Sequence, residues 1–209
     1  MKLVDKTCRE FTEVLYSKAA VPGGGGAAAL TAALGTALAG MVANLTTGKK
    51  KYAEYEEDIQ RILVQAQDIQ DDLLDMIDQD AENFSPLAKA YSMPSDTPEE
   101  KAEKAAVMEK CTITACSVPI EIVKTCHKAI KLHEELLGKG SVLALSDVGV
   151  GVECLRAAMV SGWMNVQINI KTLQDRDRAM AIEGELKPLI ADGIAISERV
   201  SSEVQARLS

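Results

Sequence analysis

A stretch without a single charged side chain, residues 19–48, constrains the fold of this chain more than any other feature. It begins with Pro22 and four glycines, and from residue 27 to 43 small residues recur every four positions. Residues four apart lie on the same face of a helix, and small residues on a face let two helix backbones approach closely. A second row, also spaced by four, is large and apolar: Leu30, Leu34, Leu38 and Val42. The pattern predicts a helix buried on all sides, at the centre of a bundle or of a symmetric dimer.

A membrane span is the alternative interpretation of this stretch, since a span needs about 20 predominantly apolar residues. Here the run starts with proline and glycines, and its central part, residues 27–43, is short and rich in Ala, Gly and Thr. The first residues, 1–6, also lack the apolar core of a signal peptide. We therefore expect a buried helix of a soluble protein that makes no contact with a membrane.

Helical spacing of apolar residues continues along the rest of the chain, whereas signals for strands are thin. Hydrophobic residues make up 47% of the chain and aromatic residues only 3%, which suits closely packed helices with aliphatic cores. The sequence predicts an all-α fold, a single-domain helical bundle of six or seven helices over residues 1–209. The first expected helices cover residues 5–18, a segment from 27 onward and an acidic segment that ends near 84. A further helix is expected from 98 to 137, with a kink or restart at Pro119. The last two are a helix capped by Ser146 and Asp147 that ends near 173, and a helix over 177–207.

Charge and cysteine usage narrow the possible partners. The net charge is −8 and the pI is near 4.9, which argues against nucleic acid because backbone binding needs a basic face. The five cysteines form no CxxC pair and do not resemble a disulfide framework, so we expect reduced thiols and a cytoplasmic location. His127 and His133 lack the spacing of a metal pair with a further ligand, so we expect no metal.

The four glycines Gly23, Gly24, Gly25 and Gly26 satisfy the letters of a dinucleotide-binding motif in the order Gly-x-Gly-x-x-Ala. The context does not fit, because a helical pattern rather than a strand precedes them and no Gly-Lys-Ser/Thr follows. Two interpretations remain open. The backbone N–H groups hold an anion or a polar ring at a helix start, or the glycines form a tight turn without a ligand.

Asp80 stands out among the many acidic residues of the segment that ends near 84. The apolar stripe of that segment passes through Leu73 and Ile77 and continues to Asp80 and Phe84. A carboxylate on the inward face of a helix needs a partner, a shifted pKa or a chemical role. The stripe alone leaves these three possibilities open for Asp80.

Five more residues are candidates for binding. Lys49 and Lys50 open the one basic triplet of an acidic chain, where a polyanionic small molecule would be attracted. Asn165 and Asn169 follow Ser161 at a spacing of four, either as an internal polar network or as the wall of a polar pocket. Asp147 sits at a helix start, where a carboxylate also serves as a plain cap.

Several segments together resemble the cyclodeaminase/cyclohydrolase family of folate enzymes. They are PGGGGAAALTAALGTALAGMVANLTTGKKKY from residue 22, DAENF at 80–84, SVPIEIV at 117–123 and SDVGVGVECLRAAMVSGWMNVQINI at 146–170. The resemblance runs over nearly the whole chain. It implies an all-helical homodimer that binds reduced folate in a crevice near the subunit interface.

The resemblance also implies roles for the candidate residues. Asp80 would move protons, and Gly23 to Gly26 would let the backbone approach the pterin or its linker. Lys49 and Lys50 would attract the glutamate tail, while Asp147, Asn165 and Asn169 would form hydrogen bonds with pterin edges or with the reacting nitrogens. Many members are expected to have Gly-Ser where this chain has Gly25-Gly26, so a serine hydroxyl has no role here.

The activity expected from the resemblance is that of a formiminotetrahydrofolate cyclodeaminase, with methenyltetrahydrofolate cyclohydrolase as the alternative and a non-catalytic helical dimer as the second alternative. No cofactor beyond the tetrahydrofolate substrate is expected. The expected partners are a folate that carries one or several glutamates and, for the deaminase, a separate formiminotransferase.

Overall fold

Six α-helices and two short 3-10 helices make up the computed structural model, which describes residues 2–209. The residues described contain no strand, so the predicted all-α fold is confirmed. The elements in chain order are α1 Cys8–Tyr16, α2 Gly24–Asn44, η1 Lys50–Tyr55, α3 Glu56–Ala90, α4 Pro98–Lys139, η2 Val142–Ala144, α5 Leu145–Thr172 and α6 Arg176–Leu208.

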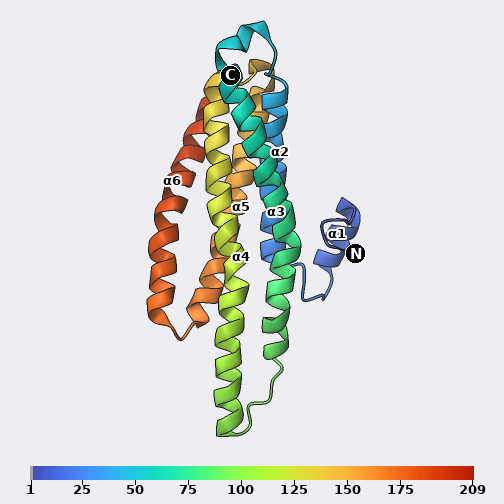
Figure 1. The fold of residues 1–209 in the computed structure, drawn as a ribbon, viewed down its shortest axis with the longest axis vertical. Helices are drawn as coiled ribbons and strands as arrows, with labels where there is room; N and C mark the ends of the chain where they lie inside the picture. The colour runs from blue at the N-terminus through green and yellow to red at the C-terminus, as the bar shows by residue number, and fades with distance from the viewer. Residues whose placement is uncertain (1) are drawn as a thin grey trace.

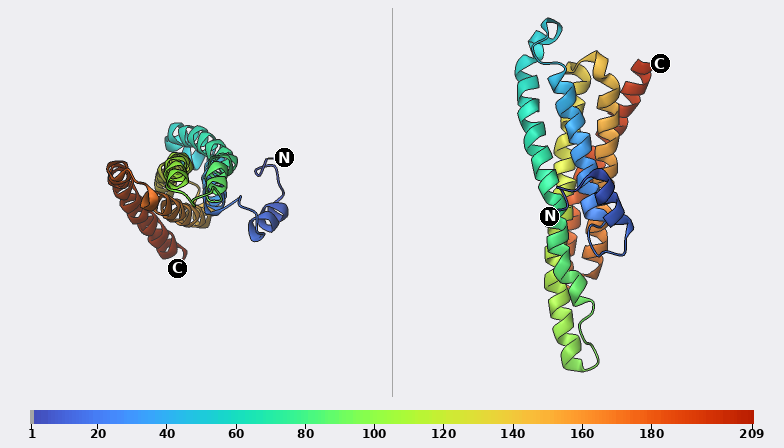
Figure 2. Two further views of the ribbon diagram at one scale, coloured as in Figure 1. Left: turned by 90° about the horizontal axis from the view of Figure 1, so that it is seen from below. Right: turned by 90° about the vertical axis from the view of Figure 1, so that its right-hand side faces the viewer.

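The four helices α2 to α5 run alternately up and down and pack side by side, as Figure 1 shows. The last helix, α6, lies outside this group and packs against α4 and α5. Viewed along the bundle in Figure 2, the short helix α1 stands apart on the side opposite to α6. Because α2 begins partway along the bundle, the hairpin of α3 and α4 extends beyond it (Figure 1).

The small residues of α2 pack it tightly against its neighbours α3, α4 and α5. Ala29, Ala32 and Ala39 are fully buried, and a Cβ atom placed on Gly35 would lie 2.8 Å from the carbonyl oxygen of Gly151 in α5. This close approach confirms the flat face expected from the spacing of small residues. By length and composition α2 is also the one helix among residues 2–209 that matches a membrane span, and 56% of the matching window is buried inside the bundle.

The opposite face of α2 corrects the expectation of burial on all sides. Leu34 is 58% exposed and Met41 is 38% exposed, whereas Val42, the last member of the large apolar row, is 0% exposed, so only one side of α2 faces outward from a single chain. The small face is the one turned to the bundle, because it allows the closest helix contacts.

Most predicted helix limits are close to those observed, and Thr97 with Glu100 forms the expected capping box at the start of α4. Three details were wrong. The glycines form the first turn of α2 rather than a turn before it, and α4 continues through Pro119 without a restart. Ser146 and Asp147 lie within the first turn of α5, whose N-cap is Ala144, and neither caps it.

Candidate functional site

The carboxylate of Asp80, on α3, is held against the first turn of α2. Its Oδ2 atom accepts a hydrogen bond of 3.1 Å from the backbone N–H of Gly26. A Cβ atom on Gly25 would lie only 2.2 Å from Asp80 Oδ1, so residue 25 must be glycine for the carboxylate to occupy this place. The first N–H groups of a helix have no acceptor within the helix, which makes this end suited to a carboxylate.

Asp80 faces a cavity of about 160 Å³ at the N-terminal end of α2. Asp80 is the one ionisable side chain in its wall, and Asn165 and Asn169 are the other two polar side chains. The segment that joins α1 to α2 closes one side of the cavity. The complete lining is Ala20, Val21, Gly23, Gly24, Gly25, Asp80, Phe84, Ala115, Pro119, Asn165, Ile168 and Asn169.

Burial of the carboxyl group raises the pKa of Asp80 to about 6, against the opposing effect of the hydrogen bond from Gly26. Desolvation disfavours the charged form of a carboxyl group, which is the physical cause of this direction. A group with such a pKa is present in both protonation states near neutral pH. It can therefore take up a proton and return it in one reaction cycle.

Asn165 and Asn169 of the polar row on α5 line this cavity, whereas Ser161 does not, so the two asparagines form part of a pocket wall as one of the two interpretations predicted. Asn165 Nδ2 donates to the backbone carbonyl of Ser161 at 2.8 Å, and Asn169 Nδ2 donates to the carbonyl of Asn165 at 2.9 Å. The amide of Asn165 also lies against Gly24, where a Cβ atom would be 3.1 Å from it. Gly24 therefore lets α5 bring its asparagines close to the start of α2.

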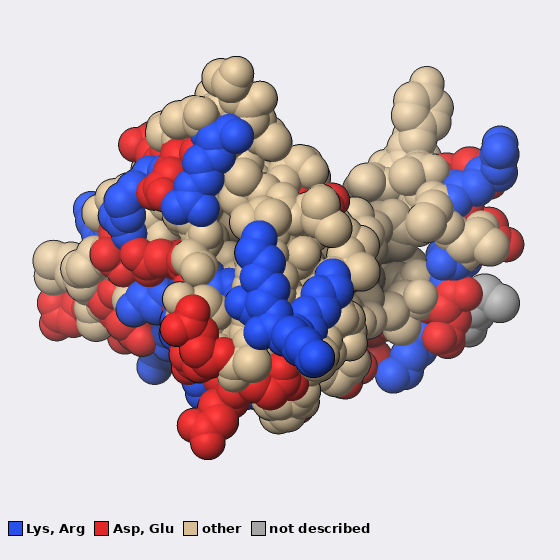
Figure 3. All heavy atoms as spheres, turned by 90° about the horizontal axis from the view of Figure 1, so that it is seen from above, with Lys and Arg blue, Asp and Glu red and all other residues tan. Residues whose placement is uncertain are grey.

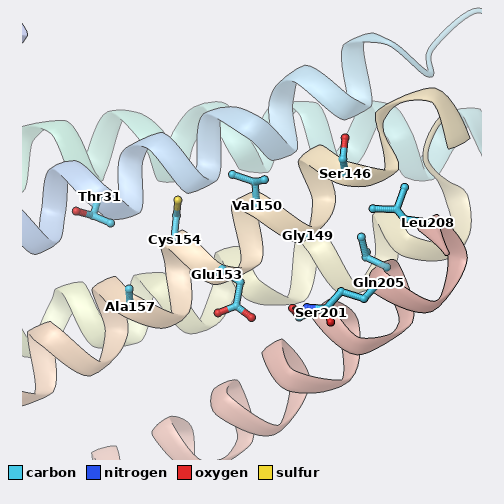
Figure 4. Close-up of a pocket in the computed structure, with 11 residues that line it drawn as sticks. Thr31, Ser146, Gly149, Val150, Glu153, Cys154, Ala157, Ser201, Gln205 and Leu208 are labelled. Atoms are coloured by element: carbon cyan, nitrogen blue, oxygen red, sulfur yellow. Dashed lines mark hydrogen bonds between the residues drawn. The ribbon is translucent and has the colours of Figure 1, made fainter.

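Two further hollows continue the cavity along the groove between α2 and α5. The first, of about 320 Å³, shares Gly24 and Asn165 with the Asp80 cavity. The second, of about 570 Å³, lies among α2, α5 and α6, and Figure 4 shows Val150 and Cys154 of α5 in it. Glu153 is the one charged residue in the wall of this larger groove. Ligand sites for small molecules commonly measure 300–1,000 Å³, so the Asp80 cavity reaches that size only together with its continuation.

Comparison with known proteins gives the family. A family model described as formiminotransferase-cyclodeaminase matches residues 7–188. The chain belongs to the formiminotransferase-cyclodeaminase family. It is 39% identical to a methenyltetrahydrofolate cyclohydrolase of Methylorubrum extorquens, over 98% of this chain and 99% of that protein. It is also 31% identical to the formimidoyltransferase-cyclodeaminase of Mus musculus, over 83% of this chain but only 32% of that longer protein.

A solved structure shows that the fold is shared as well. The crystal structure of formiminotetrahydrofolate cyclodeaminase from Thermotoga maritima superimposes over the whole of both chains with a TM-score of 0.89, at 24% sequence identity. The resemblance to folate enzymes of this family is therefore confirmed, and the chain is a folate one-carbon enzyme of the cyclodeaminase/cyclohydrolase type.

In this member of the formiminotransferase-cyclodeaminase family, the residues singled out from the sequence fall into two groups. Gly23 to Gly26, Asp80, Asn165 and Asn169 meet at one place. Lys49, Lys50 and Asp147 lie at the other end of α2 and α5, near the point where Tyr52 accepts a hydrogen bond from the backbone of Val142. With a rise of 1.5 Å per residue, the helices separate the two groups by roughly 30 Å. Figure 3 views the lysine end, where basic side chains project from the surface.

The cavity of this family member also uses residues that the sequence did not indicate. Ala115, Pro119 and Ile168 line it together with the segment before Gly23. Pro119 was interpreted only as a helix kink, and no periodicity distinguishes Ala115 from other core alanines. Their role in the wall follows from the packing of α4 against α5, which the local sequence does not specify.

Proposed function

We propose that this chain is a methenyltetrahydrofolate cyclohydrolase, which converts 5,10-methenyltetrahydrofolate to 10-formyltetrahydrofolate. The observation that carries the proposal is the Asp80 carboxyl group, alone among apolar and amide groups and with its pKa raised to about 6. The cyclohydrolase of Methylorubrum extorquens, similar over nearly its whole length, supports this choice over the deaminase expected from the sequence.

The reaction needs one proton to be moved from the attacking water to nitrogen 5 of the folate. The ionised Asp80 takes a proton from water as the water oxygen bonds to the methenyl carbon. The same proton passes to nitrogen 5 as the bond between that nitrogen and the carbon breaks. The hydroxyl proton of the adduct leaves to solvent, the formyl group stays on nitrogen 10, and Asp80 is ionised again. These reaction steps need no cofactor beyond the tetrahydrofolate substrate.

The second candidate is the formiminotetrahydrofolate cyclodeaminase, favoured by the similarity to the cyclodeaminase of Mus musculus. In that reaction nitrogen 10 attacks the protonated formimino group, and Asp80 moves the proton of nitrogen 10 to the departing ammonia. The carbon–nitrogen bond to ammonia breaks and the methenyl bridge remains. A separate formiminotransferase would then supply the substrate.

We also propose that the chain acts as a homodimer in the cytoplasm, with the outer face of α2 and α5 as its interface. This face carries large apolar side chains that are exposed in one chain, and residues 19–48 contain no charge. Exposed apolar surface of this extent favours a partner, and a two-fold axis lets the face pair with itself. Ile168 belongs to both the face and the Asp80 cavity, so a second copy would cover the mouth of the cavity. The exposed residues are Leu34, Met41, Leu45, Val142, Leu143, Val150, Met164 and Ile168.

The proposed role of Lys49 and Lys50 in attracting a glutamate tail depends on this assembly or on a long tail. The lysines lie roughly 30 Å from the glycine turn along α2. A folate with one glutamate bound at Asp80 of the same chain would end short of them. We expect the double substitution Lys49→Glu and Lys50→Glu to leave the KM for a monoglutamyl substrate within about twofold and to raise it for a polyglutamyl substrate. Equal effects on both substrates would rule out a role in tail binding.

The proposed activity is tested by incubating the protein with 5,10-methenyl- and 5-formiminotetrahydrofolate in parallel. Loss of methenyl absorbance beyond the uncatalysed rate identifies the cyclohydrolase. Gain of methenyl absorbance with release of ammonia identifies the deaminase. No turnover of either folate would contradict both proposals and favour a non-catalytic helical dimer. Sedimentation of the wild type and of Leu34→Glu tests the dimer, which the glutamate should dissociate.

A further inference from the structure

The hydrogen bonds of Asn165 and Asn169 determine which of their atoms a ligand meets. Each side chain lies 2.8–2.9 Å from a backbone carbonyl oxygen of its own helix. A carbonyl oxygen only accepts hydrogen bonds, so the amide nitrogen must face it in both residues. The Oδ1 atoms therefore point away from these contacts, and no protein donor within residues 2–209 bonds to either of them.

The third polar side chain of the cavity is also an acceptor. Asp80 Oδ2 is bonded to the Gly26 N–H, and its Oδ1 has no protein donor among the residues described. No Lys, Arg or His lines the cavity. Asp80 and the two asparagines thus present acceptor oxygens, while the donors on the cavity wall are the second N–H of each asparagine amide and the backbone N–H groups of the glycine turn.

We propose that Asn165 and Asn169 are specificity-determining residues, which together with Asp80 make this cavity select cationic over neutral folates. The inference rests on the proposed function, because 5,10-methenyltetrahydrofolate carries its positive charge on the bridge between nitrogens 5 and 10. Oxygen acceptors around a partly buried site stabilise such a cation more than a neutral group of the same shape.

This selectivity has a consequence for turnover. Hydrolysis converts the cationic methenyl bridge into a neutral formyl group, so the affinity of the cavity falls as the product forms. The product of the deaminase reaction is the methenyl cation, which the same oxygens would retain. The arrangement therefore suits the cyclohydrolase direction better than the deaminase direction.

The experiment compares the KM for 5,10-methenyltetrahydrofolate with the inhibition constant of 5-formyltetrahydrofolate, which shares the reduced pterin and the one-carbon group on nitrogen 5 but lacks the cationic bridge to nitrogen 10. We expect the ratio of inhibition constant to KM to be about tenfold or more in the wild type. Asn165→Leu and Asn169→Leu should each lower this ratio, and Asn169→Asp, which adds negative charge, should raise it. Opposite changes in Asn169→Leu and Asn169→Asp cannot come from misfolding.

The matched control is Gln167→Leu, which removes an exposed amide from the same helix and lines neither the Asp80 cavity nor the two hollows that continue it. Its ratio should equal that of the wild type. A wild-type ratio near one, or a ratio that stays unchanged in the asparagine variants, would overturn the inference while turnover still upholds the proposed function. If neither folate is turned over, calorimetric titration with the two folates decides: preference for the cation supports the inference, and equal or absent binding overturns it.

Discussion

Asp80 and His133 are both ionisable side chains that reach a glycine of a neighbouring helix, yet one faces a cavity and the other is enclosed. A Cβ atom added to Gly25 would lie 2.2 Å from Asp80 Oδ1, which is too close for both atoms to be present. The carboxyl group of Asp80 lines the cavity. The His133 ring packs equally closely on Gly151, because a Cβ atom added to Gly151 would lie 2.1 Å from Cε1 of His133. His133 is 0% exposed.

The enclosed residue joins three helices. His133 on α4 donates from Nε2 to the carbonyl oxygen of Gly35 in α2 at 2.9 Å, and its ring packs on Gly151 of α5. The nitrogen must carry the proton, because a carbonyl oxygen only accepts. Desolvation lowers the pKa of His133 to about 4, so the ring is neutral near pH 7.

Burial thus acts on both groups in the same way, by favouring the neutral form. The difference lies in access. Asp80 can exchange its proton with a ligand in the cavity, whereas His133 meets only protein. The contact at Gly25 therefore leaves an ionisable group open to a ligand, whereas the contact at Gly151 encloses one within the core.

The largest expected effect comes from Asp80→Asn, which removes the one ionisable group of the cavity. We expect kcat to fall about 10³-fold, the range typical of losing a general acid–base group. Because the ionised carboxylate is disfavoured by burial, the variant should also be more stable at pH 7 by about 1–3 kcal/mol. Steady-state kinetics and thermal unfolding measure the two effects. Full activity in a folded variant would exclude Asp80 from catalysis.

Gly25→Ala should come next, with a loss of activity of about 10²-fold, because the added methyl group displaces the carboxylate from its place. The matched control is Gly23→Ala, since a Cβ atom there has no neighbour within 4 Å. We expect Gly23→Ala to keep activity close to that of the wild type. Equal losses in the two variants would point to the flexibility of the glycine turn rather than to the position of Asp80.

At the enclosed contact, Gly151→Ala should affect stability rather than chemistry. The methyl group would overlap the His133 ring, and we expect a loss of about 2–3 kcal/mol in the free energy of unfolding. Gly184→Ala in α6, where no atom lies within 4 Å of an added Cβ, should instead stabilise the protein by about 0.5–1 kcal/mol. Denaturant titration measures both. A large fall in kcat for folded Gly151→Ala would show that the two contacts do not differ as described.

The remaining expected effects are those of pH. Activity should fall about tenfold per pH unit below the Asp80 pKa of about 6, as the base becomes protonated. His133 has a folded pKa of about 4 against an ordinary 6.5, so its contribution to stability is complete above pH 6.5 and is lost as the pH falls toward 4. The Asp80 contribution runs the other way, since its raised pKa lowers stability as the pH rises from 3.8 to about 6.

His133→Gln separates these contributions, because glutamine keeps a donor for Gly35 and does not titrate. We expect it to remove the loss of stability between pH 6.5 and 4 and to leave the pH profile of activity unchanged. Thermal unfolding and initial rates across this range provide the comparison. A shift in the activity profile would mean that His133 communicates with the site.

Much of the fold followed from local pattern. Several signals act within a few turns of one helix. They are the helical spacing of apolar residues, the capping box of Thr97 and Glu100, and the small side chains that recur between positions 27 and 43. The position of Asp80 on an inward stripe is also a local property, so this residue could be singled out without knowledge of its neighbours. The segments that resemble the folate enzymes are also local stretches of sequence, so they indicated the family without knowledge of the tertiary structure.

Only the tertiary structure determined which of these residues meet. Gly25 and Asp80, or Gly35, His133 and Gly151, come together because of how long helices pack, and no local spacing encodes that register. Helix length likewise separated Lys49, Lys50 and Asp147 from the glycine turn, since a rise of 1.5 Å per residue over α2 and α5 places them at opposite ends. The sequence by itself thus determined the helices and the inward position of the Asp80 carboxyl group, and packing determined the cavity that this group lines.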